Sequence, residues 1–268
     1  IKTFDDTFKE NFYESLEILK YDTGYKEITY YAGTSLNNII KNKEDDLESW
    51  IEVLLLFPQL YSSLKYSHNQ IQLFNGDIKL DNIFYDKLNK VLKFIDLEIS
   101  IIGKTKSLLK GGTPSYMSPF DLREFKDKKP VDLFSFDEFT FFLAIITLIY
   151  PSQLNKYFNY NQNHNNKYNK NDSLEILVTS LNLNIENLHE IENTDDLLKL
   201  IRIYTFKLLL DNIFKYKEHP LYIKNIKYIE TIKNELSNLM TDDVKNLTCN
   251  EIIKDRVKIV DYDKIFER

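Results

Sequence analysis

One short segment of the chain combines the kinds of side chain that could transfer a phosphoryl group. Residues 75–82 read NGDIKLDN, so an acid (Asp77), a base (Lys79) and an amide (Asn82) lie close together. A second acid, Asp96, follows the apolar run VLKFI fourteen residues after Asn82. Phosphoryl transfer needs a carboxylate for the attacking hydroxyl, a cation near the phosphate, and oxygen ligands for magnesium. The segment therefore predicts phosphotransfer chemistry.

The segment resembles the catalytic loop of the protein kinase family, H-R-D-x-x-x-x-N, often found as H-x-D-I-K-x-x-N. Further blocks resemble the family in the same chain order. They are DLE (96–98) for D-F-G, GGTPSYMSP (111–119) for the end of the activation loop, VDLFSF (131–136) for the start of the central helix, and LMTDDVKNLTCNEII (239–253) for a late helix. The resemblance implies an α+β, protein kinase-like fold: a predominantly helical C-lobe with a partial N-lobe β-sheet remnant.

The resemblance also implies roles for the loop residues. Asp77 would be the catalytic base, and Lys79 would contact the γ-phosphate of ATP. Asn82 and Asp96 would bind the cofactors as magnesium ligands, and Glu98 is a further candidate metal ligand. The implied cofactors are therefore ATP and Mg²⁺.

The same register predicts where adenine would bind. Residues 30–33 (YYAG) resemble the family's hinge, so the backbone of Tyr31 would meet the adenine ring. Thr29 then stands at the gatekeeper position, and Phe84 would form the floor of the pocket. Ordinary core packing explains Thr29 and Phe84 equally well.

Three downstream positions also bear on the resemblance. Thr113 resembles the threonine that contacts the catalytic aspartate and lysine in Ser/Thr-directed members. Asp132 is expected to accept hydrogen bonds from the backbone of the catalytic loop. Asp137 stands where the central helix of the family has a glycine.

Several residues depart from the family pattern. Asn75 replaces the histidine before the catalytic aspartate, and Glu98 replaces the glycine of D-F-G. Phe120 and Asn246 replace a glutamate and an arginine that form a buried salt bridge in the family. Losing both partners is physically coherent, because a single unpaired buried charge would cost about 3–5 kcal/mol. We expect Phe120 to fill that space with apolar surface.

The resemblance begins near the fourth strand of the small lobe. The Gly-rich loop and the ATP-binding lysine are therefore expected upstream of Ile1 or are absent. Lys2 is a candidate for that lysine, and Glu10 and Glu14 are candidates for its helix partner.

Local patterns predict the elements that position these residues. The expected elements are strands at 16–22 and 25–31, a helix at 45–66 that is kinked or lacks one hydrogen bond at Pro58, strands within 70–100, a loop at 101–130, an apolar helix at 132–150, an Asn-rich loop at 155–171 and helices within 173–268. We expect residues 1–31 to be the N-lobe remnant and 32–268 the C-lobe. An Asn-rich insertion at about 152–235 is the candidate partner surface.

Composition narrows the class of protein. The chain has 268 residues, 43% of them hydrophobic and 28% charged, as in globular domains. A net charge of −6 argues against nucleic acid as a partner. The apolar run at 139–150 is shorter than the roughly 20 residues of a membrane span, so no membrane partner is expected. The single cysteine, Cys249, favours a cytoplasmic location.

Three functions stay open at this level. The favoured one is a divergent Ser/Thr protein kinase that transfers the γ-phosphate of ATP to a protein substrate. A pseudokinase that binds a protein partner is favoured by Asn75 and Glu98. A kinase-like small-molecule phosphotransferase, with H-G-D and I-D-x-E motifs, is matched by Gly76 and Glu98. Lys79 and the GGTPSYMSP block favour the protein kinase.

Overall fold

The computed structural model describes residues 15–21, 24–29, 33–163, 168–183 and 188–230. Strands β1 (Ser15–Tyr21) and β2 (Gly24–Thr29) pair antiparallel, which confirms the pair of strands expected in this part of the chain. The late block at 239–253 and the candidates Lys2, Glu10, Glu14, Asn246 and Cys249 lie outside the described residues. The predicted boundary between residues 31 and 32 stays a prediction.

A small antiparallel sheet lies next to the loop at 75–82. Its strands, in the order β3-β5-β6, are β3 (Thr34–Ser35), β5 (Ile83–Asp86) and β6 (Val91–Phe94). Gly33 precedes β3 with a φ of +115°, and a Cβ there would lie 2.1 Å from the carbonyl oxygen of Tyr85. Only glycine permits this approach of the two backbones.

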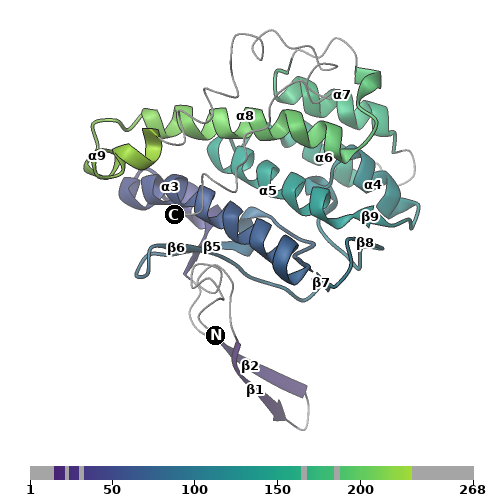
Figure 1. Cartoon of the computed structure of the whole chain (residues 1–268), viewed down its shortest axis with the longest axis horizontal. Helices are drawn as coiled ribbons and strands as arrows, with labels where there is room; N and C mark the ends of the chain where they lie inside the picture. Colours follow the sequence, from purple (N-terminus) through teal and green to yellow (C-terminus); the bar gives the residue numbers. More distant parts are fainter. Residues whose placement is uncertain (1–14, 22–23, 30–32, 164–167, 184–187, 231–268) are drawn as a thin grey trace.

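Helices form the body of the molecule. They are α2 (Leu36–Lys41), α3 (Leu47–Tyr66), α4 (Pro119–Lys126), α5 (Leu133–Ile149), α6 (Asn155–Asn163), α7 (Lys170–Ser180), α8 (Thr194–Phe214) and α9 (Pro220–Lys224). Helix α5 lies in the middle, with α3 and α8 beside it (Figure 1). Pro58 lies inside the continuous helix α3, where its missing N–H removes one helical hydrogen bond.

Short turns and strands connect these helices. They are the π-helical turn η1 (Ser67–Ile71), the 3₁₀ turns η2 (Leu80–Asn82), η3 (Pro114–Tyr116) and η4 (Leu188–Glu190), and the two-residue strands β4 (Leu73–Phe74), β7 (Ile101–Ile102), β8 (Lys106–Ser107) and β9 (Val131–Asp132). Strand β4 pairs with β7, and β8 pairs with β9. The segment between the sheet and α4 is therefore tied to the body at two places.

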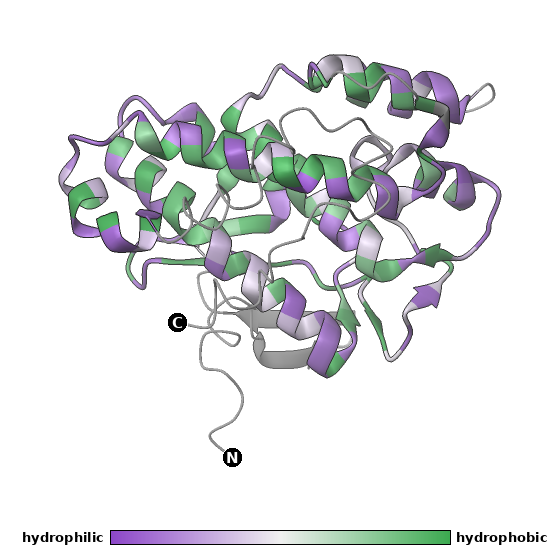
Figure 2. Cartoon of the chain, turned by 45° about the horizontal axis from the view of Figure 1, so that its top comes forward, coloured by the Kyte–Doolittle hydropathy of each residue, from purple (hydrophilic) through white to green (hydrophobic). Residues whose placement is uncertain are grey.

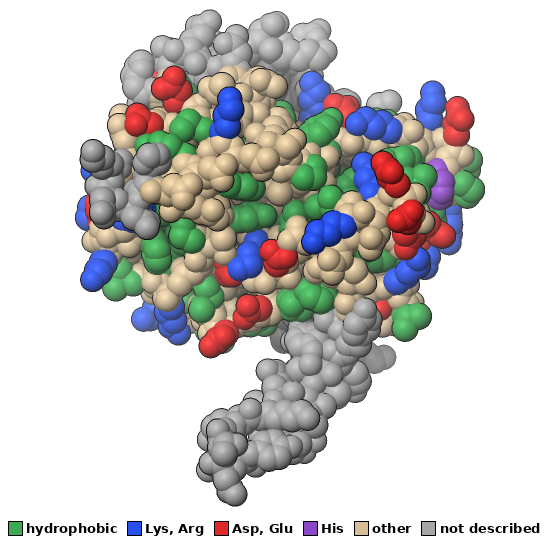
Figure 3. Space-filling model, turned by 180° about the vertical axis from the view of Figure 1, so that it is seen from behind, with side chains coloured by type: hydrophobic (Ala, Val, Ile, Leu, Met, Phe, Trp, Pro, Cys, Tyr) green, Lys and Arg blue, Asp and Glu red, His purple; other side chains and the backbone are tan. Residues whose placement is uncertain are grey.

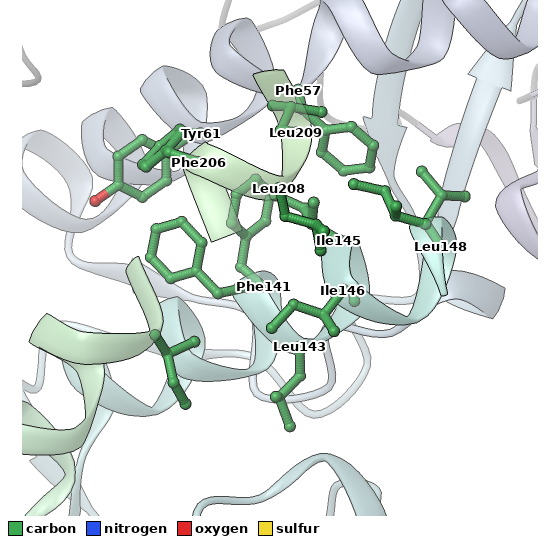
Figure 4. Packing of buried hydrophobic residues seen from close by; sticks show 14 of the residues in the cluster. Phe57, Tyr61, Phe141, Leu143, Ile145, Ile146, Leu148, Phe206, Leu208 and Leu209 are labelled. Carbon is green, nitrogen blue, oxygen red and sulfur yellow. The ribbon is translucent and has the colours of Figure 1, made fainter. Parts of the chain in front are cut away.

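The core is built around α5. Nearly every residue of this helix is buried, as expected for a helix that is apolar on all sides. Phe141 stacks on Tyr61 of α3 with ring centroids 5.5 Å apart, and Phe206 of α8 joins the same cluster (Figure 4). The outer helices also carry hydrophilic stretches (Figure 2). This pattern confirms the predicted apolar helix at 132–150.

The predicted loop at 101–130 is wrong at its end, because α4 begins there. The Ser118 hydroxyl accepts a hydrogen bond from the Asp121 amide at 3.0 Å and caps the helix. Pro119 occupies the first helical position, where its missing N–H costs nothing. This start signal is present in the sequence, but the glycines and prolines before it favour a loop.

The predicted solvated loop at 155–171 is also wrong in part. Residues 155–163 form α6, and α7 begins at Lys170. Leu154, Tyr157 and Asn161 recur at helical spacing and are all buried. The high asparagine content predicts a solvated segment, but the burial of this one face of the helix decides the structure. Leu177 of α7 and Ile201 of α8 also join the main core.

No helix in the described part of the chain combines the length and apolar character needed to cross a membrane. On the face shown in Figure 3, lysine and arginine side chains lie among aspartate and glutamate side chains. That face shows no continuous stripe of one charge.

The core around Phe141 yields a stability prediction. Phe141→Ala leaves a cavity between α3, α5 and α8, and we expect the free energy of unfolding to fall by about 3–5 kcal/mol. Urea unfolding followed by circular dichroism measures the change. Leu88→Ala is the control, since Leu88 is 91% exposed and should change stability by less than about 0.5 kcal/mol. Equal losses in both variants would contradict the packing described here.

Candidate active site

Asp77 is the centre of a hydrogen-bonded group of polar side chains. Its carboxylate accepts from the Lys79 ammonium at 2.6 Å and from the Thr113 hydroxyl at 2.6 Å. Lys79 also donates to the Thr113 oxygen at 3.0 Å, which closes a triangle of three groups. The side chains of Asp77 and Lys79 keep 13% and 23% of their surface exposed. The structure therefore brings together an acid and a cation that solvent can still reach.

Successive side chains of this loop point alternately into the core and toward solvent. Ile78 and Leu80 are buried in the core and anchor the loop, so Asp77 and Lys79 point the other way. The 3₁₀ turn η2 then begins at Leu80, with the Asn82 amide bonded to the Lys79 carbonyl at 2.9 Å. The alternation fixes the direction of both charged side chains.

Asn82 completes the group on the other side of Asp77. Its side-chain amide donates to the Asp77 carboxylate at 3.1 Å and to the Asp77 carbonyl at 3.0 Å. Asn82 precedes β5 and Asp96 lies two residues after β6, and Ile83 pairs with Phe94 in this hairpin. The Ile95 amide donates to the Asn82 carbonyl at 3.0 Å. The hairpin thus brings Asn82 and Asp96 to the same end.

Asp96 has an unusual backbone conformation. Its φ is +58°, a left-handed value that few residues other than glycine adopt, and its side chain is exposed. Such strain persists where the surrounding structure fixes it, and it is concentrated at functional sites. Glu98 is also exposed, two residues further along the same turn.

The donor chemistry of Asn82 and Asp96 fits magnesium. The Asn82 nitrogen is bonded to Asp77, which leaves its amide oxygen as the acceptor. The described residues contain no cluster of three or more acids, histidines or cysteines that could hold a metal ion. Magnesium at a nucleotide usually takes one or two carboxylates together with phosphate oxygens and water. An amide oxygen and one carboxylate are consistent with such a site.

Two glycines let Thr113 approach Asp77. Gly112 has a φ of +114°, and a Cβ there would lie 3.0 Å from the Gly76 carbonyl oxygen. Gly76 itself has a φ of +84°. The backbones of the loop and of the segment at 111–119 can therefore come close enough for Thr113 to bond both Asp77 and Lys79.

The predicted role of Asp132 is wrong, because Asp137 holds the loop instead. The Asp137 carboxylate accepts from the Asn75 amide at 2.7 Å and from the Gly76 amide at 2.9 Å. Asp132 caps α5 and accepts from the Ser135 amide at 3.2 Å. Asp137 is one helical turn further along α5 and fully buried, so its carboxylate lies under the loop.

A signal for Asp137 is present in the sequence. Residues 137–141 read DEFTF, which matches the order of residue types in the family's D-I-W-S-L except at the second position, where Glu138 replaces an apolar residue. The sequence carries no signal for the contact of His68 with Asp137. Its Nε2 lies 3.0 Å from the Asp137 carboxylate, and both side chains are fully buried. His68 also stacks on Phe74, with ring centroids 4.9 Å apart.

Asn75 preserves one loop contact in the place of the family histidine. Its side-chain oxygen accepts from the Asp77 amide at 3.0 Å, and its backbone carbonyl accepts from the Ser100 hydroxyl at 3.1 Å. The side chain is almost completely buried. This departure is therefore compatible with the ordered loop.

The structure describes only some of the residues that are predicted to form the adenine site. Phe84 lies on β5, opposite Ser35 of β3 and Lys93 of β6, and is half-buried. Its neighbours in the strand, Ile83 and Tyr85, are buried on the opposite face. Thr29 ends β2, and Tyr31 lies outside the described residues. The adenine site formed by these three residues therefore stays a prediction.

Phe120 is buried at the start of α4, as expected for an apolar replacement of the family glutamate. The ammonium of Lys170 lies 4.5 Å from the centroid of its ring. The next residue, Asp121, is fully buried, and its carboxylate accepts from the Ser118 hydroxyl at 2.7 Å. Burial, with smaller contributions from Asp132 and Asp195, raises the pKa of Asp121 to about 7.

Comparison with known proteins identifies the family. A model of the protein kinase domain matches residues 20–255, which is most of the chain. The chain belongs to the protein kinase family and has an α+β protein kinase-like fold. Protein kinases in general use ATP and Mg²⁺.

Among curated proteins, no match is found. Among solved structures, the chain is similar to a chain in the crystal structure of the yeast RNA Pol II CTD kinase CTDK-1 complex, with 22% sequence identity and a TM-score of 0.44. The match covers 55% of this chain and 46% of that one, so it spans less than half of the yeast chain.

Replacing Asp132, the N-cap of α5, or Asp137, within α5, distinguishes the roles of the two acids. Asp137→Asn replaces an acceptor oxygen with an N–H₂ group facing buried donors, so we expect unfolding free energy to fall by about 1–3 kcal/mol. Asp132→Asn should change stability by less than about 0.5 kcal/mol, because asparagine caps helices as well as aspartate does. Urea unfolding compares them. A larger loss for Asp132→Asn would restore the original sequence prediction.

The pKa of Asp121 predicts a pH dependence. Because the folded-state pKa of Asp121 is raised, protonation of its carboxyl group stabilises the folded chain. This contribution to the free energy of unfolding is fully present below about pH 4 and is lost as pH rises through about 7. Asp121→Asn should remove a difference on the order of 3 kcal/mol between these pH values. Chemical unfolding of both proteins from pH 4 to pH 8 measures it. Parallel stability curves would show that Asp121 does not titrate in this range.

Proposed function

We propose that the chain is a Ser/Thr protein kinase that transfers the γ-phosphate of ATP to a hydroxyl of a protein substrate. One observation carries this proposal: the Asp77 carboxylate is accessible and bonded to both Lys79 and Thr113. No folding requirement explains why an acid and a cation of one loop converge with a hydroxyl from the segment at 111–119. Thr113 also resembles the threonine that makes these contacts in Ser/Thr-directed family members.

The reaction assigns each group a task. The oxygen of the substrate hydroxyl attacks the γ-phosphorus, and the bond from that phosphorus to the β-phosphate oxygen breaks, which releases ADP. Asp77 orients the hydroxyl and accepts its proton. Lys79, held next to Asp77, places a positive charge where the phosphoryl group passes. Thr113 keeps both side chains in this arrangement.

Asn82 and Asp96 would hold magnesium, with Glu98 as an additional ligand. When bound, the metal ion neutralises charge on the phosphates. Asn82 also restrains Asp77 through its side-chain amide. Phe84 and Thr29 would contact the adenine ring, together with the backbone of Tyr31.

A pseudokinase is the second candidate. Glu98 favours it, because a charged residue replaces the glycine of the D-F-G motif at an exposed turn. In that case the same loop would be retained to bind a nucleotide or a protein partner without transfer. The two candidates differ in one measurable property, the transfer of phosphate.

Transfer of labelled γ-phosphate from ATP to a generic Ser/Thr substrate tests the proposal in the full chain. Asp77→Asn should lower the rate by about 10²–10⁴-fold, because it removes the proton acceptor. Asp96→Asn should lower it similarly through loss of the metal ligand. Asp81→Asn is the control: Asp81 is an exposed acid of the same loop that bonds Asn37, and transfer should be unchanged. Absence of transfer by the unaltered chain would favour the pseudokinase.

A further inference from the structure

A polar hollow lies between the end of α4 and the start of α7, two helices that pack against each other (Figure 1). Arg123 and Lys126 of α4 and the C-cap residue Asp127 line it on one side, and Tyr168, Asn169 and Lys170 line it from the other side. Its volume is about 630 Å³, enough for a side chain with its flanking residues. We name it the basic hollow. None of the residues around Asp77 lines it.

The charge of the basic hollow is opposite to that of the chain. The chain carries a net charge of −6, but the hollow gathers three cations, Arg123, Lys126 and Lys170, with one acid, Asp127. The lining therefore carries a charge of about +2. Cations that repel one another at short range are stable together when an anion binds between them.

Aromatic rings hold two of the cations in place. The Lys126 ammonium lies 4.4 Å from the centroid of the Tyr168 ring, and the Lys170 ammonium lies 4.5 Å from that of the buried Phe120. Such cation–π contacts restrict the side chains before a ligand arrives. Burial also lowers the pKa of Lys126. An anion beside it would offset that cost.

Arg123 supplies directional hydrogen bonding. Its side chain is 56% exposed, and Asp127 lies 3.9 Å from the Nε atom, on one edge of the guanidinium group. The two terminal nitrogens form the other edge and can bond two oxygens of one anion. Asn169 caps the eleven-residue helix α7 at the same place, so the positive end of the helix dipole adds to the cations.

We propose that the basic hollow binds the phosphate of a phosphorylated serine or threonine in a protein partner. A phosphate monoester carries a charge of about −1.5 to −2 at neutral pH, which matches the +2 of the lining. A single carboxylate would neutralise only half of it. Three acceptor oxygens also suit one guanidinium edge and two ammonium groups.

The position of the basic hollow connects it to the segment before α4. The Tyr168 hydroxyl donates to the Pro119 carbonyl at 2.8 Å, and Pro119 begins α4 at the end of the segment that contains Thr113. A partner bound by its phosphate would lie beside this segment. The binding itself does not require phosphoryl transfer, so it can be measured independently of the proposed function.

Fluorescence anisotropy with a labelled glycine–alanine peptide that contains one phosphothreonine tests this site. The full chain should bind it saturably, and Lys126→Gln/Lys170→Gln should weaken binding at least about tenfold. Arg123→Gln should weaken it as well and, at an exposed position, cannot act by unfolding the chain. Lys217→Gln/Lys224→Gln is the control with the same change in net charge, at exposed positions near α9.

Three further arms distinguish the ligand. The unphosphorylated peptide should bind at least about tenfold more weakly, and so should a peptide with glutamate in place of phosphothreonine. Inorganic phosphate should compete. Asp77→Asn should bind the phosphopeptide normally, so a failure of phosphoryl transfer leaves this test intact. Absence of binding, equal weakening by the two double variants, or equal affinity for the phosphorylated and unphosphorylated peptides would overturn the proposal.

Discussion

The buried carboxylate of Asp137 is the contact on which the candidate active site depends. It lies inside the most completely buried helix and accepts from the Asn75 and Gly76 amides at 2.7 and 2.9 Å. His68 lies in the turn after α3, and its Nε2 atom is 3.0 Å from the same carboxylate. A buried carboxylate that receives several hydrogen bonds has few alternative arrangements, so it transfers the rigidity of the core to the loop.

The neighbouring Glu138 ties the same helix to two others. Lys65 of α3 and Arg202 of α8 both contact its carboxylate, at 2.5 and 2.6 Å. Burial alone would raise the pKa of Glu138, but these two cations outweigh it and the pKa lies below its usual value. Consecutive acids of α5 therefore have separate tasks: one fixes the loop at 75–82, and the other fixes the helices that pack around α5.

The loop itself could be predicted because its polar residues are close in sequence. Asp77, Lys79 and Asn82 are close in the sequence, and in the folded chain Asp77 forms direct hydrogen bonds with the other two. Asp137 could not be assigned in this way, since Asp132, five residues earlier, fits the family motif better in the sequence. The depth of each residue in the core decides between them. Tyr157 and Asn161 are likewise buried through tertiary contacts, because both side chains donate hydrogen bonds to the carbonyl of Met117, which is distant in the sequence.

Calorimetric titration of ATP into the full chain, with and without Mg²⁺, tests most directly whether the loop held by Asp137 belongs to a nucleotide site. Binding should require Mg²⁺ and should weaken at least about tenfold in Asp96→Asn, because a metal ligand is lost. Asp77→Asn should bind ATP as the unaltered chain does, since the proposed task of Asp77 is proton transfer. Absence of binding, or equal binding with and without Mg²⁺, would contradict the assignment of Asn82 and Asp96 to a metal–nucleotide site.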